Sequence, residues 1–244
     1  MGFYGIIDSG VGGLTILRQI TQSGNFNLTY IADHAFCPYG LKPNKIIFQR
    51  VSKLVNYLQL HGADGAVLAC NTASVYAPLL KEIYRIPIYD VITPTCKAVL
   101  DVNVRRVALL ATKSTISNGM YKQILQQSGV QVVNFDCSAF VPFVEQCSTD
   151  SVQCFKTIDS ALSALPQANA DAVILGCTHF PLLRRQISYY CGDSKIVECR
   201  CPLSASFAED KLAVQPVLLT TGDVNLANAA ASWYGNVSFK HIDL

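Results

Sequence analysis

The chain has 244 residues, half of them apolar, enough for one large domain or for two of about 100 residues each. Charged residues make up 15%, and 19 Lys and Arg against 17 Asp and Glu leave a formal charge of +2. This balance excludes a protein that binds nucleic acid through a basic surface, and the apolar content excludes a disordered chain.

The first half of the sequence alternates short apolar runs with longer amphipathic segments. It predicts strands at 3–7, 28–32, 65–69 and 88–91, and helices at 14–20, 46–60 and 74–84. The helix at 46–60 has the clearest period, with apolar residues at 47, 48, 51, 54, 55 and 58.

The second half continues the same rhythm. It predicts strands at 107–110, 130–135 and 172–175, and helices at 117–127, 157–165 and 181–190. A last strand at 217–221 and helix at 226–233 form one more unit, which we expect to return to the first domain. Strands separated by helices are typical of βαβ units and of a mostly parallel sheet.

The two halves also resemble each other in sequence. Lys122-Gln123-Ile124 repeats Arg18-Gln19-Ile20 at an offset of 104 positions, and 172–177 repeats 65–70 at an offset of 107. One alternative is that any two βα units look alike. We predict two similar open α/β domains related by a pseudo-twofold axis, with the active site in the cleft between them. The first would comprise residues 1–92 and 206–244, and the second residues 93–205.

Ten cysteines raise the question of disulfides, which we do not expect. Asp8 interrupts the first apolar run, so no signal peptide is predicted, and cysteines that are not exported stay reduced. The longest uncharged stretch, 65–80, is shorter than the ~20 apolar residues that cross a bilayer. We therefore expect a cytoplasmic protein without membrane contacts.

Polar clusters follow several of the predicted strands. They are Asp8-Ser9, Pro38-Tyr39-Gly40, Cys70-Asn71-Thr72 and Cys177-Thr178-His179. Ligands of open α/β sheets bind at the carboxyl ends of the strands. Cys70 and Cys177 occupy equivalent places in the repeat, so a twofold axis would make them face each other across the cleft. Two such groups can remove a proton from one face of a carbon and return one to the other. The alternative is that both are small apolar core residues.

These motifs resemble those of the glutamate racemases. The matching segments are 8–13, 38–40, 69–73, 111–112 with Thr115, 140–142 with Glu145, and 176–181, and 221–223 also matches. The resemblance covers residue 6 to about residue 187. It implies a cofactor-independent enzyme that makes D-glutamate for peptidoglycan, working as a homodimer on a small-molecule substrate.

The resemblance also implies roles for individual residues. Cys70 would take the proton from D-glutamate with help from Asp8, and Cys177 from L-glutamate with help from His179 and, behind it, Glu145. Asp8 could instead cap a helix. His179 could be a core histidine, and Glu145 could be a solvated residue on the surface of a helix. The residues expected to bind the substrate are Asp8, Ser9, Tyr39, Gly40, Asn71, Thr72, Thr115, Thr178 and His179.

Nothing in the sequence indicates a cofactor or a metal. The glycines at 10–13 lack the Gly-Lys-Ser/Thr of a phosphate loop and the third glycine of a dinucleotide fingerprint. Cys191, Cys199 and Cys201 include no Cys-x-x-Cys pair, so we expect no zinc. No lysine lies in a context that indicates pyridoxal phosphate.

Other functions remain open from the sequence. The substrate could be aspartate or another amino acid of the same superfamily, because the sequence does not show which side-chain length the cleft accepts. A catalytically inactive amino-acid binding protein is a further alternative, and a thiol redox protein is weakened by the lack of Cys-x-x-Cys. The chain departs from the family pattern at 43–45 and at 198–204, and we expect no N-terminal regulatory extension.

Overall fold

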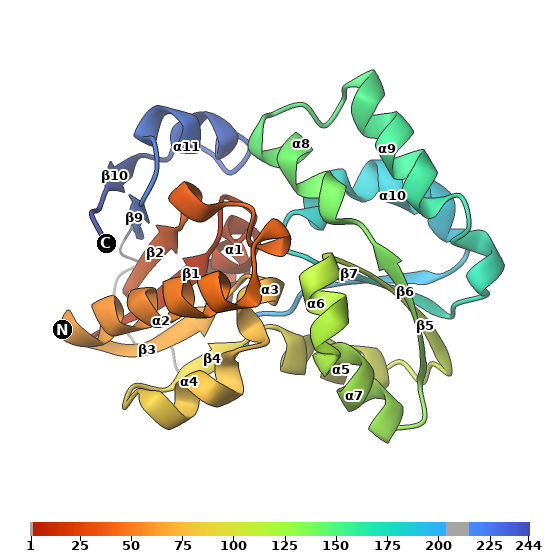
Figure 1. Cartoon of the computed structure of the whole chain (residues 1–244), viewed down its shortest axis with the longest axis horizontal. Helices are drawn as coiled ribbons and strands as arrows, with labels where there is room; N and C mark the ends of the chain where they lie inside the picture. Colours follow the sequence, from red (N-terminus) through yellow and green to blue (C-terminus); the bar gives the residue numbers. More distant parts are fainter. Residues whose placement is uncertain (1, 204–214) are drawn as a thin grey trace.

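The computed structural model of the chain describes residues 2–203 and 215–244. Within these residues it contains two β-sheets flanked by helices (Figure 1). The larger sheet has the order β10-β9-β2-β1-β3-β4, made of β1 (Phe3–Asp8), β2 (Leu28–Ala32), β3 (Ala63–Leu68), β4 (Ile88–Asp90), β9 (Val217–Thr220) and β10 (Phe239–His241). The smaller sheet has the order β6-β5-β7-β8, made of β5 (Arg106–Ala111), β6 (Gln131–Asp136), β7 (Ala172–Gly176) and β8 (Lys195–Glu198). All neighbouring strands are parallel, which confirms the predicted fold class.

The helices connect these strands. In chain order they are α1 (Leu14–Ser23), α2 (Asn44–Leu60), α3 (Asn71–Ser74), α4 (Ala77–Ile83), α5 (Ile92–Leu100), α6 (Lys113–Asn118), α7 (Met120–Gln127), α8 (Val141–Glu145), α9 (Val152–Leu162), α10 (Arg184–Cys191) and α11 (Val224–Ala230). Helix α2 buries the apolar face that its period predicts, with Ile47, Val51, Leu54, Val55 and Leu58 inside.

The internal repeat of the sequence has a counterpart in the topology. Four strands of the larger sheet follow the order β2-β1-β3-β4, and the smaller sheet follows the same order as β6-β5-β7-β8. Strands β1 and β5 are therefore equivalent, as are β3 and β7. Cys70 follows β3 and Cys177 follows β7, so the two thiols stand at equivalent strand ends.

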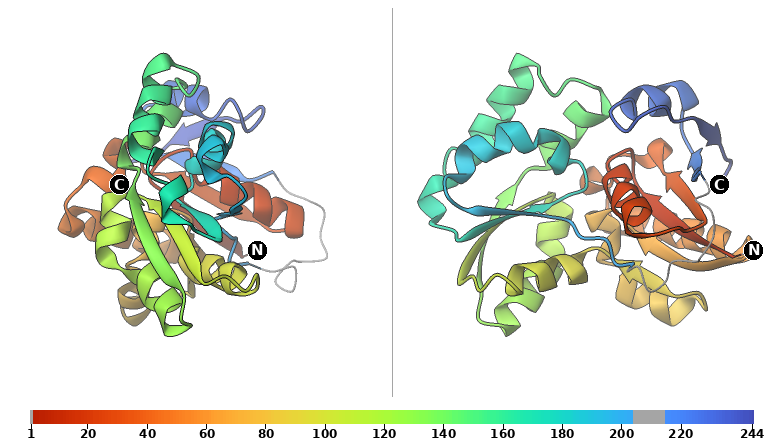
Figure 2. Two further views of the ribbon diagram at one scale, coloured as in Figure 1. Left: turned by 90° about the vertical axis from the view of Figure 1, so that its right-hand side faces the viewer. Right: turned by 180° about the vertical axis from the view of Figure 1, so that it is seen from behind.

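The C-terminal segment belongs to the larger sheet. β9 pairs with β2, with Thr29 opposite Val217 and Ala32 opposite Thr220. The chain after β8 leads from the smaller sheet back toward the larger one (Figure 2). We propose domain limits of 1–92 with 206–244 and of 93–205, and note that residues 206–214 lie outside the described part of the chain.

Two predicted helices after the cysteines differ from expectation. The helix predicted over 74–84 begins earlier, at Asn71, and is divided into α3 and α4. Pro78 lies in the first turn of α4, where its missing N–H removes no helical hydrogen bond. The helix predicted over 181–190 begins as the 3₁₀ turn η5 (Phe180–Leu183) and continues as α10.

Local backbone chemistry explains two further differences. The helix predicted over 117–127 is interrupted at Gly119, whose φ of +81° ends α6 before α7 begins. Helix α9 begins at Val152, five residues earlier than predicted, because the Ser151 hydroxyl accepts a hydrogen bond from the backbone N–H of Cys154.

In the described part of the chain, the α-helices α5 and α8 and the strands β8 and β10 were not predicted. The crossing between the two proposed domains, near Thr93 and Pro94, lies in helix α5. Its first turn is stabilised by Asp90, whose carboxylate accepts hydrogen bonds from the N–H and the hydroxyl of Thr93. β8 and β10 are only four and three residues long, too short to show a clear pattern.

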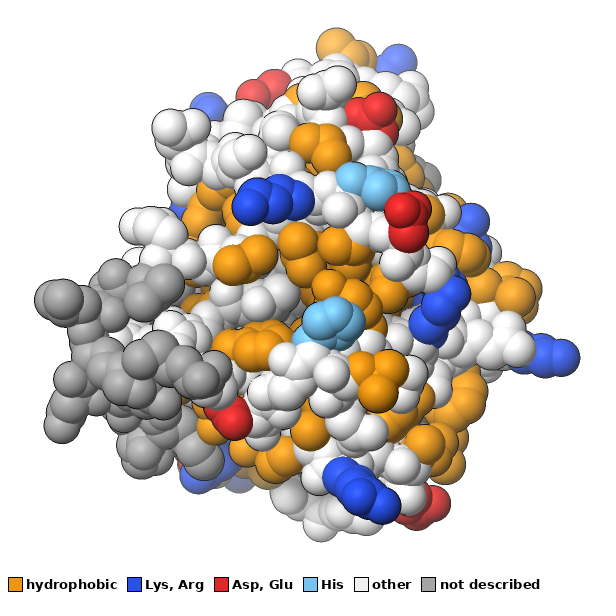
Figure 3. Space-filling model, turned by 90° about the vertical axis from the view of Figure 1, so that its left-hand side faces the viewer, with side chains coloured by type: hydrophobic (Ala, Val, Ile, Leu, Met, Phe, Trp, Pro, Cys, Tyr) orange, Lys and Arg blue, Asp and Glu red, His pale blue; other side chains and the backbone are white. Residues whose placement is uncertain are grey.

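Apolar side chains of both sheets meet in one buried cluster. It includes Ile6 and Val67 of the larger sheet together with Leu110 and Leu175 of the smaller one. In the described ranges no helix is long and apolar enough to span a membrane. On the face shown in Figure 3, charged side chains of both signs lie scattered among apolar and uncharged ones.

Candidate active site

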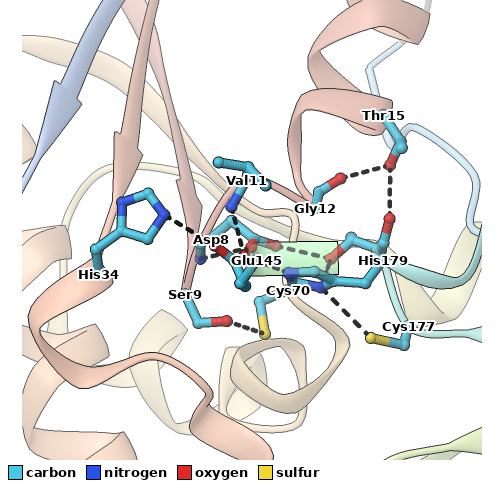
Figure 4. A network of polar contacts seen from close by, with 12 residues as sticks. Asp8, Ser9, Val11, Gly12, Thr15, His34, Cys70, Glu145, Cys177 and His179 are labelled. Atoms are coloured by element: carbon cyan, nitrogen blue, oxygen red, sulfur yellow. Dashed lines mark hydrogen bonds and ion pairs between the residues drawn. The ribbon is translucent and has the colours of Figure 1, made fainter. Parts of the chain in front are cut away.

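The polar residues singled out in the sequence converge where the two sheets present their carboxyl ends (Figure 4). Asp8 is the last residue of β1, Cys70 follows β3, Cys177 follows β7, and Glu145 is the last residue of α8. The two cysteines are buried, with 7% and 6% of their surface exposed. The predicted catalytic residues therefore lie together between the sheets, with Glu145 half-buried and the others buried.

Cys177 has an imidazole and a carboxylate behind it. Its sulfur lies 3.7 Å from Nδ1 of His179, and Nε2 of His179 lies 2.5 Å from Oε1 of Glu145. Although burial lowers the pKa of His179, its hydrogen bonds to Cys177 and Glu145 raise this pKa well above the ordinary value. The imidazole of His179 therefore places a positive charge and an N–H donor beside the sulfur of Cys177.

Glu145 accepts hydrogen bonds from three donors. The backbone N–H of Val11 lies 2.9 Å from Oε1, which His179 also contacts, and Nε2 of His34 lies 3.1 Å from Oε2. Burial opposes ionisation, but the hydrogen bonds from His179 and His34 hold the pKa of Glu145 well below its ordinary value. The carboxylate is therefore charged and held by three donors, which contradicts the alternative of a solvated surface residue.

Cys70 has different neighbours. Its sulfur lies 3.9 Å from the hydroxyl of Ser9. Burial raises the pKa of Cys70, the charge of Asp8 raises it further, and the backbone N–H of Ala73 and the Ser9 hydroxyl act against this rise. This sulfur is therefore held mainly as the neutral thiol.

Asp8 lies between the two sides. It is fully buried, accepts a hydrogen bond from the N–H of Gly10 at 2.9 Å, and accepts another from the hydroxyl of Thr178 at 3.0 Å. Burial raises the pKa of Asp8, and the nearby His179 lowers it. The bond to Gly10 is a short local turn, while the bond to Thr178 links the ends of β1 and β7.

A cluster of threonine hydroxyls lies on the Cys70 side. The hydroxyl oxygen of Thr72 is 3.0 Å from that of Thr112 and 3.3 Å from that of Thr115. All three side chains are buried. Thr112 also caps α6 by accepting the N–H of Thr115. Thr112 appeared in a matching motif but was not predicted to bind substrate.

Asn71 is held by two residues of the smaller sheet's half. Its amide nitrogen donates to the sulfur of Cys199 at 2.9 Å, and its amide oxygen accepts from the hydroxyl of Tyr121 at 2.6 Å. Cys199 is a buried core residue. Its sulfur also contacts a predicted binding residue, and it lies in the segment 198–204 that departs from the family pattern.

Tyr39 and Gly40 play a visible structural part. The hydroxyl of Tyr39 donates to Asp33 at 2.6 Å, and Asp33 is also held by both ends of the Arg50 guanidinium. A Cβ at Gly40 would lie 2.7 Å from Cβ of Thr112, so only glycine allows this approach. Gly12 is similar, since a Cβ there would lie 2.4 Å from Nδ1 of His179.

The main residue missed in the sequence is His34. It follows β2 directly after Asp33, so it stood at the end of a strand, the same signal that identified the other clusters. An open pocket of about 680 Å³ adjoins it, lined in part by Cys37, Pro38, Val141, Glu145 and Gly222. In the part of the chain that is described, no group of three His, Cys, Asp or Glu side chains is arranged to hold a metal ion.

Comparison with known proteins places this geometry in a family. The family model described as Asp/Glu/Hydantoin racemase matches residues 19–199. A glutamate racemase from Corynebacterium kroppenstedtii is 36% identical over 232 residues, covering 93% of this chain and 78% of that protein.

Solved structures are similar over the whole chain. A glutamate racemase isoform from Bacillus anthracis has a TM-score of 0.92 at 28% identity, covering 100% of this chain and 98% of that one. A glutamate racemase from Francisella tularensis, solved in complex with D-glutamate, has a TM-score of 0.88 at 25% identity, covering 100% and 97%. Since the family model spans most of the sequence, including the ends of β3 and β7 where the two thiols stand, this chain belongs to the Asp/Glu/hydantoin racemase family.

Proposed function

We propose that this protein interconverts L- and D-glutamate, without a cofactor, by exchanging the Cα proton between Cys70 and Cys177. The observation that carries the proposal is the pair of buried thiols at equivalent ends of β3 and β7, each with its own polar neighbours. The similar proteins support glutamate as the substrate, because they are glutamate racemases and one of them was solved with D-glutamate.

The reaction in the L-to-D direction begins at Cys177. Its thiolate forms an S–H bond to the Cα proton, the Cα–H bond breaks, and the electron pair moves toward the α-carboxylate. The thiol of Cys70 then gives its proton to the opposite face of Cα and becomes a thiolate. The configuration is inverted, one proton has left the substrate and one has entered it, and the reverse direction starts at Cys70.

The surroundings of the thiols suit these steps. The Cα proton of an amino acid is very weakly acidic, so the base must be held in contact with it and the developing charge must be stabilised by fixed donors. His179 supports the base on one side and Asp8 lies beside Cys70 on the other. The hydroxyls of Thr72 and Thr115 and the side chain of Ser9 are the candidate donors for the substrate carboxylates.

We further propose that the D-glutamate supplies peptidoglycan synthesis in the cytoplasm and that the enzyme is a homodimer. These points are supported by the resemblance of the motifs, and the last can be checked by light scattering of the purified protein.

The decisive experiment is incubation with L-glutamate or L-aspartate in D₂O. We expect deuterium from the solvent to appear at Cα of glutamate, as measured by NMR. We also expect the D-isomer to accumulate, as measured by chiral chromatography. The variant carrying both Cys70→Ser and Cys177→Ser is the control and should do neither. If only aspartate exchanged its Cα proton, the substrate would be aspartate and not glutamate. If neither amino acid exchanged it, the result would favour a binding protein without turnover.

A further inference from the structure

We propose that His34 is a positioning residue for the Cys177 half of the reaction, because it holds the Glu145 carboxylate in the orientation that supports His179. The proposal rests on the proposed function for its catalytic meaning. Its structural basis is independent of the substrate and lies in contacts on both ring nitrogens of His34.

His34 is fixed by strands of the larger sheet. It begins the 3₁₀ turn η1 (His34–Phe36) after β2, and its Nδ1 lies 2.9 Å from the hydroxyl of Thr220 on β9. The neighbouring strands β2 and β9 pair directly, with Ala32 opposite Thr220. The ring also meets Phe239 edge-on, at 6.3 Å between ring centres. This leaves Nε2 directed at Glu145, 3.1 Å from Oε2.

The hydrogen-bond pattern assigns a donor role to that nitrogen. The hydroxyl oxygen of Thr220 accepts the N–H of Gly222 at 3.1 Å, so its own proton is available for Nδ1 of His34. Nδ1 then accepts, and Nε2 carries a proton that it donates to Glu145. Each ring nitrogen of His34 thus has its own hydrogen-bond partner.

The Glu145 carboxylate needs such a donor. Glu145 ends the five-residue helix α8, its side chain is 15% exposed, and it borders the open pocket. Val11 and His179 hold Oε1, whereas among the described residues His34 is the hydrogen-bond partner of Oε2. The terminal torsion of a glutamate is broad, so without His34 the carboxylate could turn Oε2 toward water in the pocket and weaken its bond to His179.

The contacts also join the two halves of the molecule. His34 and Val11 belong to the half with the larger sheet, while Glu145 and His179 belong to the half with the smaller one. His34 therefore connects the support of Cys177 to the half that carries Cys70. The contacts described for Cys70 involve Ser9, Ala73 and Asp8, so losing His34 should affect one thiol and spare the other.

Three variants of the full chain test this. His34→Ala removes the contact, and His34→Gln keeps an N–H at the place of Nε2. His61→Gln is the matched control, because His61 is exposed at the end of α2 and bonds only locally, to the Tyr57 carbonyl oxygen. Thermal unfolding of each variant, followed by circular dichroism, establishes that it is folded.

The first readout is the alkylation rate of each thiol by iodoacetamide, resolved by mass spectrometry. We expect His34→Ala to slow alkylation of Cys177 about tenfold and to leave Cys70 within about twofold, since losing a hydrogen bond to a charged group has effects of this order. His34→Gln should restore the rate to within about threefold. This readout needs no glutamate turnover.

The second readout is elimination of chloride from the L- and D-forms of 3-chloroglutamate. The base breaks Cα–H, the electron pair forms the Cα=Cβ bond, chloride leaves, and the enamine hydrolyses to 2-oxoglutarate and ammonia. We expect His34→Ala to slow the L-form about tenfold and the D-form by less than twofold.

The outcomes separate the two proposals. If His34→Ala leaves Cys177 alkylation unchanged, slows both thiols equally, or is not rescued by His34→Gln, the role of His34 is wrong. If the wild-type protein fails to exchange the Cα proton of glutamate while the alkylation pattern holds, the proposed substrate is wrong and the positioning role of His34 stands.

Discussion

Cys70 and Cys177 stand at the ends of equivalent strands, β3 and β7, and both are buried, yet their neighbours differ. Cys177 has the imidazole of His179 at 3.7 Å, itself bonded to Glu145. Cys70 has a hydroxyl at 3.9 Å, and its pKa is raised by burial and by Asp8. The repeat thus duplicates the position of the backbone without duplicating the electrostatic surroundings.

This difference shows how a site with two thiols can hold a single proton between them, so that one sulfur serves as the base and the other as the acid. Two neighbouring thiolates in a buried site would repel each other, and two neutral thiols would provide no base. An imidazolium on one side and a carboxylate on the other favour one thiolate and one thiol. The imidazolium beside Cys177 and the carboxylate near Cys70 are opposite charges, and we expect Cys177 to act as the base toward L-glutamate.

The largest expected effect comes from removing either thiol. Cys70→Ser and Cys177→Ser should each lower racemisation by about 10³-fold, because turnover needs one sulfur as base and the other as acid. With 3-chloroglutamate, Cys70→Ser should retain elimination only for the L-form, and Cys177→Ser only for the D-form. The measurement is 2-oxoglutarate release from each enantiomer.

A third buried cysteine provides the control for these variants. Cys191 donates to the Ile187 carbonyl oxygen, a bond that serine can also make, so Cys191→Ser should keep full activity. If both active-site variants eliminated both enantiomers equally, the assignment of one thiol to each face would be wrong.

Removing a residue beside one of the thiols should lower activity less than removing the thiol itself. His179→Asn should slow elimination from the L-form about 10²-fold, and Asp8→Asn should slow the D-form more than the L-form. Each change removes the group beside one sulfur and leaves the other sulfur in place. Equal loss for both enantiomers in either variant would argue for a role in substrate binding or folding.

The pH dependence of thiol labelling sharpens the contrast. At pH 7 we expect iodoacetamide to label Cys177 about tenfold faster than Cys70. Because the pKa of Cys70 is raised, its thiolate fraction stays small and grows with pH, so its labelling rate should climb about tenfold per pH unit from pH 6 to pH 9. A Cys70 labelling rate that stays level over this range would contradict the raised pKa.

A smaller effect is expected from the contacts that hold Asn71 next to Cys70. Cys199→Ala and Tyr121→Phe each remove one of its two partners, at 2.9 and 2.6 Å. We expect KM for glutamate to rise about threefold with kcat nearly unchanged, because a looser amide affects binding more than proton transfer. Tyr57→Phe, on the distant helix α2, is the control, and a pure loss of kcat would assign Asn71 to catalysis.

No effect is expected from stripping metal or trapping a carbonyl cofactor. Activity should survive dialysis against a chelator and treatment with hydroxylamine, since the two thiols and their neighbours supply both the acid and the base. Loss of activity that zinc or pyridoxal phosphate restores would overturn the cofactor-independent mechanism.

Much of the fold could be predicted from the sequence, because the positions of strands and helices depend on local patterns. The α/β class, the parallel sheets and the strand-end clusters at Asp8, Cys70 and Cys177 all follow from short apolar runs with polar residues behind them. The family resemblance was also confirmed. Helix α5 was not predicted because its start depends on a side-chain contact, from Asp90 to Thr93, and not on a hydrophobic period. Strands β8 and β10 were not predicted because they are too short to show a period.

The sequence by itself determined which residues stand at the ends of strands, because that information is local. Only the tertiary structure decided which of them meet. Glu145 is hydrogen-bonded to Val11, 134 positions away in the sequence, and to His34, 111 positions away. Asn71 donates to the sulfur of Cys199, 128 positions away. These pairs form because the two sheets present their carboxyl ends to each other, and the resulting asymmetry between the thiols is set by burial and charge across that junction.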